Sequence, residues 1–517
     1  MSTQRSKVAL DRLRILKPVA RAFALGYLTT TLPKLISLLK TLRRRDVSTA
    51  EKLQRLIRIL HCGFKWDRFP VFCALLAGGS SILPRALEVV RLRFASGGYL
   101  QSLPTTGIPL SSNRPLRFLA AFLSALICFP ILNRTAKHPY GRRAGLDQHA
   151  SSDQSNVAKK NKDYGNGNGN GGGNNFDDND KHHLAGRTLD LTLFATTRAA
   201  DAIVNLLWSQ WKTSPRAAHG KSKTGQRVHS LAPKLADTGL FAISSAIVMW
   251  AWFYLPERLP YSYGKWISEA AQLDSRILEA LRTARRGEWA YGRDNGDQVV
   301  LESMCADYGW PIEWGTPQKT VPIPCEIVHM GCGPNCEKTA IWRFARAFKF
   351  ACATYIPLQI VMRCRSRNLK TYIHAIKSAL RSSTFLGLFV SLFYYSVCLA
   401  RTRLGPKLFS SKTVTPMMWD SGLCIAAGCA MCGWSIFVES AGRRQEISLF
   451  VAPRALATLL PREYDKKYQW RERLAFSLST AILVACTHEN PNMDCTHENP
   501  NMVRGVFGKF LARVFKA

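Results

Sequence analysis

The sequence predicts an all-α, polytopic membrane helical bundle built from two related repeats. Three observations support this fold class. Long apolar segments alternate with basic connectors, short sequence matches recur in the same order in two parts of the chain, and small residues are frequent in the apolar segments. Neither Ser382–Leu399 nor Gly422–Val438 contains Asp, Glu, Lys, Arg or His. The alternative, a soluble α-helical protein with Ala-rich core helices, fits two such uncharged stretches less well.

Ten apolar or amphipathic segments are expected to form the helices of the bundle. Several are about 17–20 residues long, which is near the lower limit for crossing a hydrocarbon core. The segments that carry Ala-Arg-Ala-Phe can instead lie in the membrane interface, because basic residues recur along them. The ten are Pro18–Leu39, Phe69–Val90, Leu116–Leu132, Leu189–Trp208, Leu235–Leu255, Ile341–Met362, Ser378–Ala400, Met417–Val438, Glu446–Leu460 and Leu474–Cys486.

Short matches between the two groups of segments predict an internal duplication. Any one match can arise by chance, but four in the same order are typical of membrane proteins with repeats. The matched pairs are Ala20–Phe23 with Ala345–Phe348, Leu193–Ala199 with Leu449–Ala455, Phe241–Ile247 with Phe476–Ile482, and Tyr263–Trp266 with Phe507–Phe510.

The duplication and the connectors between the segments divide the chain into five parts. Glycine and asparagine alternate in the second part, and this composition is typical of a disordered linker. The parts are 1–146, the first half of repeat 1 with a basic N-terminus; 147–187, the disordered linker; 188–267, the second half of repeat 1; 268–324, a polar connector with an amphipathic helix; and 325–517, the cysteine-rich motif with repeat 2.

Charge and cysteine usage favour an intracellular membrane over other settings. The chain has 71 Lys and Arg against 35 Asp and Glu, a net charge of +36. These charges lie between apolar segments, as expected beside an anionic membrane, so nucleic-acid binding is disfavoured. Many of the 15 cysteines lie inside apolar segments, which fits a compartment that keeps thiols reduced. Residues Met1–Gly26 resemble a mitochondrial presequence, and a cytosolic basic flank of the first segment is the alternative.

Small residues and two arginines mark places where helices are expected to meet. Glycines let helix backbones approach closely in lipid, and the candidates are Gly78, Gly79, Gly422, Gly428 and Gly433. Arg198 and Arg454 fall in or beside apolar segments, where a charge is costly. Each either serves a function within the membrane or pairs structurally within the bundle or at its interface.

The most informative motif has the spacing Cys-x3-His-x2-Cys-x3-Cys. Its members are Cys325, His329, Cys332 and Cys336, and thiolates with an imidazole are the ligands that Zn²⁺ prefers. The spacing is not that of a familiar zinc finger, so a local disulfide and a thiol-bearing structural turn remain open. A second Cys/His pattern, the perfect tandem copy within residues 486–502, is interpreted as a recent local duplication or a gene-model error.

The same region resembles the cysteine-rich part of the transmembrane protein 135 family. The similarity rests on Cys325–Cys336, Tyr355–Leu358, Ser383–Leu386 and Arg401–Gly405, and extends over about Cys325–Leu460. Residues Val19–Ile267 more weakly resemble the family's other half. This fungal-like chain departs from the animal members in the order of its halves. Gly-Pro-Asn-Cys also stands here in place of the family's His-Pro-Ser-Cys.

The resemblance implies a peroxisomal or mitochondrial membrane protein linked to fatty-acid or sterol metabolism and organelle dynamics. We therefore expect a non-enzymatic protein whose partners are the lipid bilayer, a lipid or sterol ligand, and membrane proteins or a second copy of itself. A channel or a protein-translocase-like component is one alternative, because the helices also distantly resemble the inner-membrane import translocases. A thiol- or metal-dependent membrane enzyme using Glu326 or Glu337 is the other. No cofactor is expected unless the cysteine cluster holds zinc.

Overall fold

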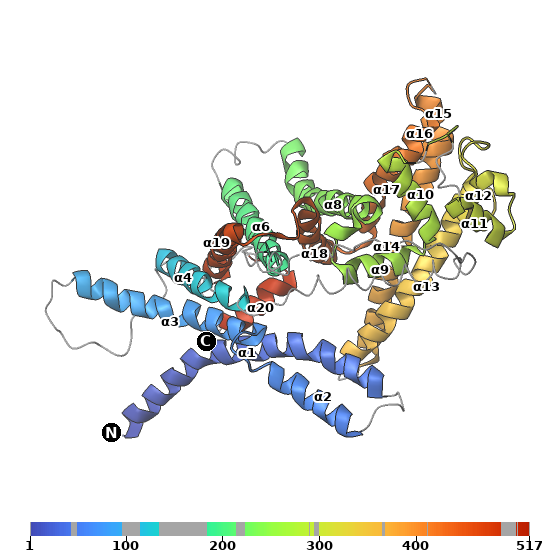
Figure 1. The fold of residues 1–517 in the computed structure, drawn as a ribbon. Coiled ribbons are helices and arrows are strands. Elements are labelled where there is room, and N and C mark those ends of the chain that lie inside the picture. The colour runs from blue at the N-terminus through green and yellow to red at the C-terminus, as the bar shows by residue number, and fades with distance from the viewer. Residues whose placement is uncertain are drawn as a thin grey trace, which may run out of the picture. The chain divides into compact units, whose positions relative to one another are not determined.

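The computed structural model shows an all-α protein (Figure 1). It describes residues 2–42, 49–95, 114–133, 184–213, 223–288, 290–293, 299–363, 368–410, 412–487, 503 and 505–515. Most of the expected linker at 147–187 lies outside these residues, as does most of the tandem copy at 486–502.

The described helices group into two compact units. Unit 1 comprises residues 1–212 and 463–517, and unit 2 comprises residues 213–462. The C-terminal segment therefore folds with the N-terminal part of the chain, whereas the sequence division placed it with the cysteine-rich region. Two contacts explain this placement. Strand β1 (Leu184–Ala185) pairs antiparallel with β2 (Tyr464–Asp465), and buried Glu472 accepts hydrogen bonds from Thr188 and Thr192 at 2.6 and 3.0 Å.

The described part of unit 1 contains seven helices. The rings of Phe72, Phe129 and Phe476 meet in its core, with centroids 5.1–5.9 Å apart. The helices are α1 (Ser2–Leu42), α2 (Thr49–Cys62), α3 (Phe69–Ala95), α4 (Arg114–Asn133), α6 (Leu189–Thr213), α19 (Gln469–Thr487) and α20 (Gly505–Phe515).

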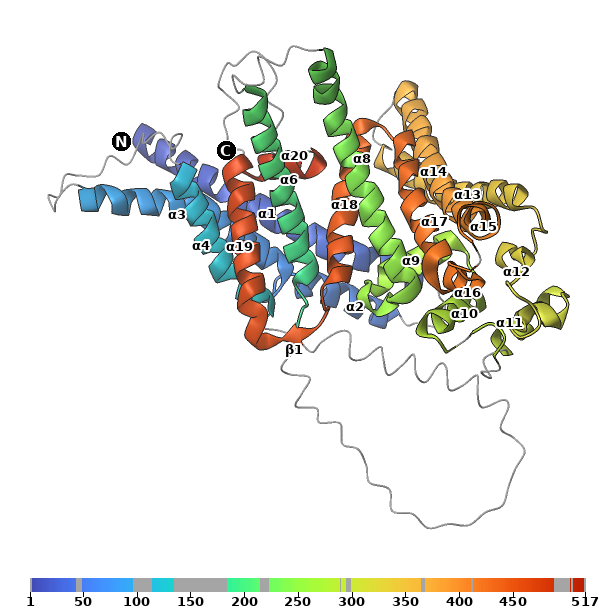
Figure 2. The same cartoon turned by 90° about the horizontal axis from the view of Figure 1, so that it is seen from above.

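Unit 2 packs five long helices beside a set of shorter ones, and Figure 2 shows α8, α17 and α14 side by side. Its core includes the stacked rings of Phe253 and Phe393. The long helices are α8 (Lys223–Tyr254), α13 (Cys336–Met362), α14 (Leu369–Cys398), α17 (Cys424–Cys432) with its 3₁₀ continuation Gly433–Val438, and α18 (Ala441–Leu459). The shorter ones are α9 (Tyr261–Ala271), α10 (Ser275–Arg286), α11 (Val299–Tyr308), α12 (Cys325–His329), α15 (Gly405–Leu408) and α16 (Pro416–Met418).

The helices of the two units pack in the same order. In unit 1, α1 packs on α3, α3 on α4, α4 on α19, and α20 on α1. In unit 2, α13 packs on α14, α14 on α17, α17 on α8, and α9 on α13. Each unit thus contains helices mainly from one sequence group together with the last two helices of the other group. Unit 1 includes α19 and α20 from the second group, and unit 2 includes α8 and α9 from the first.

Four helices within the described ranges are long and apolar enough to cross a membrane. They are Pro115–Asn133, Leu235–Tyr254, Leu369–Leu408 and Pro416–Val438, and Phe69–Pro84 is a shorter apolar helix. The segments Pro18–Leu39 and Ile341–Met362, which carry the Ala-Arg-Ala-Phe matches, form helices but are not among the four.

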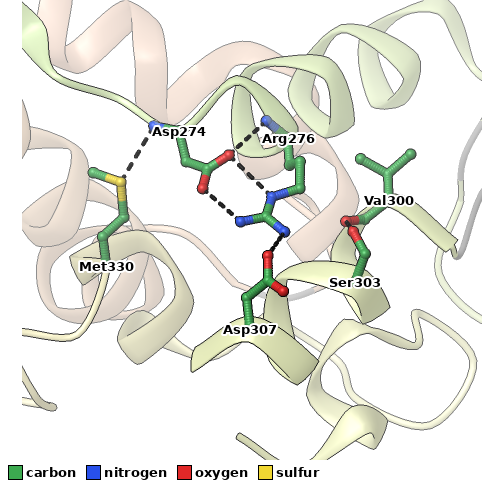
Figure 3. Close-up of polar contacts among 6 residues, drawn as sticks. All are labelled: Asp274, Arg276, Val300, Ser303, Asp307 and Met330. Carbon is green, nitrogen blue, oxygen red and sulfur yellow. Dashed lines mark hydrogen bonds and ion pairs between the residues drawn. The ribbon is translucent and has the colours of Figure 1, made fainter. Parts of the chain in front are cut away.

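An ion-pair cluster holds the connector helices beside the cysteine motif (Figure 3). Arg276 bridges Asp274 at 3.0 Å and Asp307 at 2.5 Å, which joins the start of α10 to the end of α11. Asp274 is also the N-cap of α10, because its carboxylate accepts the Arg276 backbone N–H at 2.9 Å. The Asp274 backbone N–H lies 3.3 Å from the Met330 sulfur, next to His329. The cap therefore supports the loop that carries the cysteines.

This cluster predicts a measurable dependence on pH. Hydrogen bonds from Arg276 hold the pKa of the Asp274 carboxyl below its ordinary value. A depressed native pKa stabilises the fold at pH values above the unfolded pKa of about 3.9, and that contribution is lost as the pH falls through the lower native pKa. We expect Asp274→Ala to cost about 1 kcal/mol through loss of the cap. Thermal unfolding between pH 3 and 7 tests this, with Asp274→Asn as the control that keeps the cap and removes the titration.

Candidate functional site

The two arginines of the apolar segments are each held against aromatic rings. Buried Arg198 in α6 has its guanidinium carbon 5.4 Å from the Phe194 ring centre and 5.5 Å from that of Phe507 in α20. Both distances suit a cation–π contact, which gains strength when it is desolvated. Arg198 is therefore paired within the bundle of unit 1.

Arg454 in α18 has the corresponding surroundings in unit 2. Its guanidinium carbon lies 3.6 Å from the Phe450 ring centre and 5.2 Å from that of Tyr263 in α9. Phe450 precedes Arg454 by four residues, as Phe194 precedes Arg198, and Tyr263 is the sequence match of Phe507. The same three-residue arrangement thus recurs in both units, and it favours the structural interpretation of both arginines.

The candidate packing glycines differ in what surrounds them. A Cβ at Gly433 would lie 2.5 Å from the Ala242 Cα in α8, and one at Gly79 would lie 2.2 Å from the Ser124 hydroxyl in α4. A Cβ at Gly428 would meet the Phe393 ring at 2.9 Å, whereas Gly78 has more room. Gly422 has a φ of +155° and lies at a bend, so its conformation matters in addition to its size.

The cysteine motif forms a buried cluster that includes a residue from another helix. The metal-binding atoms of Cys325, His329 and Cys336 all lie within 4.8 Å of one another. Nε2 of His329 also lies 3.3 Å from Sγ of Cys398, at the C-terminal end of α14. Cys336 also lies near both Cys325 and Cys398. Cys332, the fourth member of the sequence motif, is not in this group.

The loop after α12 explains why Cys332 is left out. Met330, Gly331 and Gly333 all have positive φ, so the chain turns sharply and returns Cys336 toward Cys325. Cys332 lies within this turn and is partly exposed. Asn335 then caps α13 by accepting the backbone N–H groups of residues 337 and 338. Cys336 becomes the first residue of that helix.

Burial makes the Cys325 thiol hard to ionise. It raises the pKa of Cys325 to about 11, although nearby Arg401 opposes the shift. Burial also raises the pKa of Cys332. All cysteines that the structure describes are free thiols. Neutral, buried thiols are poor nucleophiles, so this arrangement does not favour thiol-based catalysis or rapid disulfide exchange.

A buried ion pair lies one helical turn beyond Cys398. Arg401 binds Asp420 through two hydrogen bonds at 2.5 and 2.9 Å, and both side chains are about 5% exposed. The Tyr291 hydroxyl donates to Asp420 at 2.5 Å and accepts the Ile323 backbone N–H at 2.9 Å. Burial, and then the Asp420 charge, raise the pKa of Tyr291. Arg401 and Asp420 both lie in π-helical turns, which often occur at functional positions.

A small apolar cavity of about 50 Å³ adjoins this ion pair. Arg401 and Asp420 form part of its wall, and the remainder is apolar, with Phe393 and Ile327 among the lining residues. Such a volume accommodates a water molecule or a methyl group and is far too small for an acyl chain or a sterol. A second pocket, in unit 1, has a larger volume of about 360 Å³ and a mixed polar and apolar lining, and it lies between α1, α2, the start of α3 and the start of α6. Neither pocket is lined by Arg198 or Arg454.

The two glutamates considered as a catalytic acid or base lie at the edge of the cysteine cluster. Glu337 forms an ion pair with Arg403 on the surface, which lowers the pKa of the carboxyl through the hydrogen bond from the guanidinium. Glu326 is partly exposed on α12. An ion-paired carboxylate with a lowered pKa is a weak base, so Glu337 is poorly suited to proton transfer.

Comparison with known proteins finds no matching family model, no matching curated protein and no matching solved structure.

Sequence reasoning missed Cys398 and the pair Arg401–Asp420. Cys398 was one of several cysteines within apolar segments, and nothing in its spacing linked it to a motif 62 residues earlier. A usable signal did exist for the ion pair. Arg401 directly follows an uncharged stretch and Asp420 directly precedes another, and opposite charges at the ends of neighbouring apolar helices often pair.

Proposed function

We propose that this chain is a non-enzymatic integral membrane protein of a peroxisome or mitochondrion that acts in membrane organisation or in handling fatty acids or sterols. The observation that carries the membrane assignment is a partly inverted distribution of side chains on the long helices, which bury small polar residues beside an apolar core and expose other large apolar residues. The organelle and the lipid chemistry rest on the resemblance of the cysteine-rich segment, and the proposal includes them on that basis.

Helix α8 illustrates the inverted distribution. Thr238, Ser244 and Ser245 are buried, whereas Leu240 and Ile243 on the same helix are exposed. Soluble proteins bury large apolar side chains and expose polar ones, whereas bundles in lipid place small polar residues between helices. Helices α4 and α19 show the same arrangement, with buried Ser124 and Ser477 beside exposed Ile127 and Leu478 respectively. The exposed faces therefore suit a hydrocarbon solvent.

Helix α2 adds a feature suited to the membrane surface. Leu53, Ile57 and Leu60 form an exposed apolar stripe, and Trp66 is exposed shortly after the helix. Arg55 and other basic residues lie between the apolar positions. A basic amphipathic helix followed by tryptophan is typical of segments that lie in the interface plane. Such a helix would couple unit 1 to lipid packing.

We also propose that the units are two repeats that have exchanged their final helices. The repeated order of helix packing and the matching environments of Arg198 and Arg454 support this. A further parallel lies on α1 and α13, where Arg343 stands three residues before Arg346, the sequence match of Arg21. Arg21 of α1 donates to the Arg513 carbonyl of α20 at 3.0 Å, and Arg343 of α13 donates to the Ala271 carbonyl of α9 at 3.2 Å. Inverted or parallel repeats are a common basis of membrane proteins.

The size of the cavity limits how a lipid could be handled. The cavity of about 50 Å³ in unit 2 is too small for a lipid, whereas the pocket in unit 1 is larger, at about 360 Å³. A bilayer lipid or sterol would therefore bind in the unit 1 pocket or on an outer face of a unit, among exposed apolar side chains. The alternative of a channel or translocase calls for a polar path beside the intramembrane arginines, and the ring contacts of Arg198 and Arg454 give it little support.

Two measurements on a C-terminally tagged chain test the proposal: its location in the cell relative to organelle markers, and its resistance to extraction from membranes by alkaline carbonate. We expect the full chain to stay in the pellet after alkaline carbonate treatment and to coincide with a peroxisomal or mitochondrial marker. Cells lacking the chain should then show altered organelle number or altered fatty-acid or sterol content. Release into the supernatant, or nuclear staining, would reject the membrane assignment. Retention with unchanged organelles and lipids would reject the proposed role while leaving the membrane assignment intact.

A further inference from the structure

We infer that Cys325, His329, Cys336 and Cys398 form a closed structural site for a zinc ion. The site would join the loop between α12 and α13 to the C-terminal end of α14. The ligand set differs from the sequence motif, because Cys398 takes the place of Cys332. All four residues lie in unit 2, and their contacts do not depend on whether the chain has the proposed membrane role.

The ligand atoms of three of these residues, and the contact of His329 with Cys398, approach the separations of a tetrahedral ion. Zinc binds cysteine sulfur at about 2.3 Å and histidine nitrogen at about 2.0–2.1 Å, so neighbouring ligand atoms should lie about 3.5–3.8 Å apart. The observed 3.3 Å between His329 Nε2 and Cys398 Sγ is close to that range. The atoms of Cys325, His329 and Cys336 lie within 4.8 Å of one another. Binding of the ion would draw the three thiols and the imidazole together to these separations.

The histidine is oriented as a zinc ligand requires. Its ring is 1% exposed, and Nδ1 lies 2.7 Å from the Gly333 carbonyl oxygen. A carbonyl can only accept, so Nδ1 carries the proton and Nε2 presents its lone pair toward the thiols. Metal-bound histidines commonly make such a hydrogen bond through the ring nitrogen that does not bind the metal, and it fixes their tautomer. A histidine serving only to fill the core would not need its free nitrogen aimed at a group of thiols.

The surroundings also favour thiolate ligands once a cation is present. Cys336 is the first residue of the 27-residue helix α13, where the helix dipole favours negative charge. Arg401 provides a positive charge near Cys325. Three thiolates and Zn²⁺ carry a net charge of −1, which these neighbours help to offset. Three soft ligands with one imidazole favour zinc over magnesium or calcium, which prefer oxygen.

Four protein ligands leave no open position, so the site would be structural. Catalytic zinc sites keep a position for water or substrate. The link would anchor the cysteine-rich loop next to the π-helical turn that carries Arg401, and it would therefore support the buried ion pair with Asp420. Each thiol would lose its proton on binding, so zinc affinity should fall as the pH is lowered.

The test compares the zinc content of variants of the full, detergent-solubilised chain in which one cysteine at a time is replaced by alanine. We expect about one zinc per wild-type chain and a decrease of at least tenfold in retained zinc for Cys398→Ala after mild chelation. Cys332→Ala should keep the wild-type zinc content, although it removes a thiol from the same loop. Cys432→Ala, which removes a fully buried thiol outside the cluster, controls for general loosening of unit 2.

A measurement on the wild-type chain guards against variants that fail to fold. Cobalt bound in place of zinc should give the visible bands of tetrahedral coordination and a thiolate-to-cobalt charge-transfer band. Alkylation followed by mass spectrometry should show Cys325, Cys336 and Cys398 becoming more reactive together when a chelator is added, with Cys332 unchanged. Absence of zinc and of the cobalt bands would overturn the inference. So would a disulfide among the four residues, or zinc lost by Cys332→Ala but kept by Cys398→Ala.

Discussion

Asp420→Ala is expected to destabilise unit 2 by about 3–5 kcal/mol, because it leaves the buried Arg401 charge without its partner. The carboxylate accepts two hydrogen bonds from Arg401 and one from Tyr291, and both members of the ion pair are about 5% exposed. Removing the acceptor leaves a guanidinium that is only 6% exposed without its carboxylate partner. Thermal unfolding of the detergent-solubilised chain, followed by circular dichroism, should show a midpoint lower by about 10 °C.

A matched set of variants separates the lost charge from lost packing. Replacing the pair and the tyrosine together, by Arg401→Met with Asp420→Leu and Tyr291→Phe, removes both charges and the hydroxyl, leaves only the Ile323 backbone N–H without its acceptor, and should restore most of the stability. Tyr291→Phe alone removes two hydrogen bonds, one to Asp420 and one from Ile323, and should cost about 1–3 kcal/mol. If the triple variant is as unstable as Asp420→Ala, volume and not charge controls this site, and the argument fails.

The general fold could be predicted from the sequence because its signals are local. Uncharged stretches such as Gly422–Val438 indicate helices that suit lipid, and that interpretation needs no knowledge of tertiary contacts. The recurrent positions of Arg198 and Arg454 were likewise visible as matches. Their ring partners Phe507 and Tyr263 lie far along the chain, so the cation–π contacts became visible only in the folded units.

The division into units could not be predicted, because it depends on which helix fills which position. Two matched segments, Phe241–Ile247 and Phe476–Ile482, have similar sequences and could each pack within either unit. The choice is made by particular contacts, such as buried Glu472 with Thr188 and the pairing of β1 with β2. A pattern of similar residues cannot distinguish an exchanged helix from one that stays with its own group.

The cysteine cluster shows the same limit at the level of one residue. Spacing in the sequence grouped Cys332 with its neighbours, since it lies between His329 and Cys336. The positive φ values of Gly331 and Gly333 turn the loop so that this thiol leaves the group, and the packing of α14 on α13 brings in Cys398. Local spacing predicts which residue types are available, whereas tertiary packing selects the set.

Ile243→Lys should strongly impair membrane integration, although Ile243 is 65% exposed. The residue lies near the middle of the apolar helix Leu235–Tyr254. A lysine at the centre of a membrane-spanning helix costs about 2.5–3.5 kcal/mol, which corresponds to roughly a hundredfold change in an insertion equilibrium. In a soluble protein the same exchange at an exposed position would be nearly neutral. The size of the loss in membrane integration therefore shows whether lipid or water surrounds this face of the helix.

Ile312→Lys provides the matched control, because Ile312 is 57% exposed in the same unit but lies outside the apolar helices. The measurement is the carbonate-resistant fraction of newly made full-length chain, together with its steady-state amount. Ile243→Lys should lower both, and Ile312→Lys should leave both unchanged. Equal, small effects of the two lysines would mean that the exposed face of α8 does not lie in lipid.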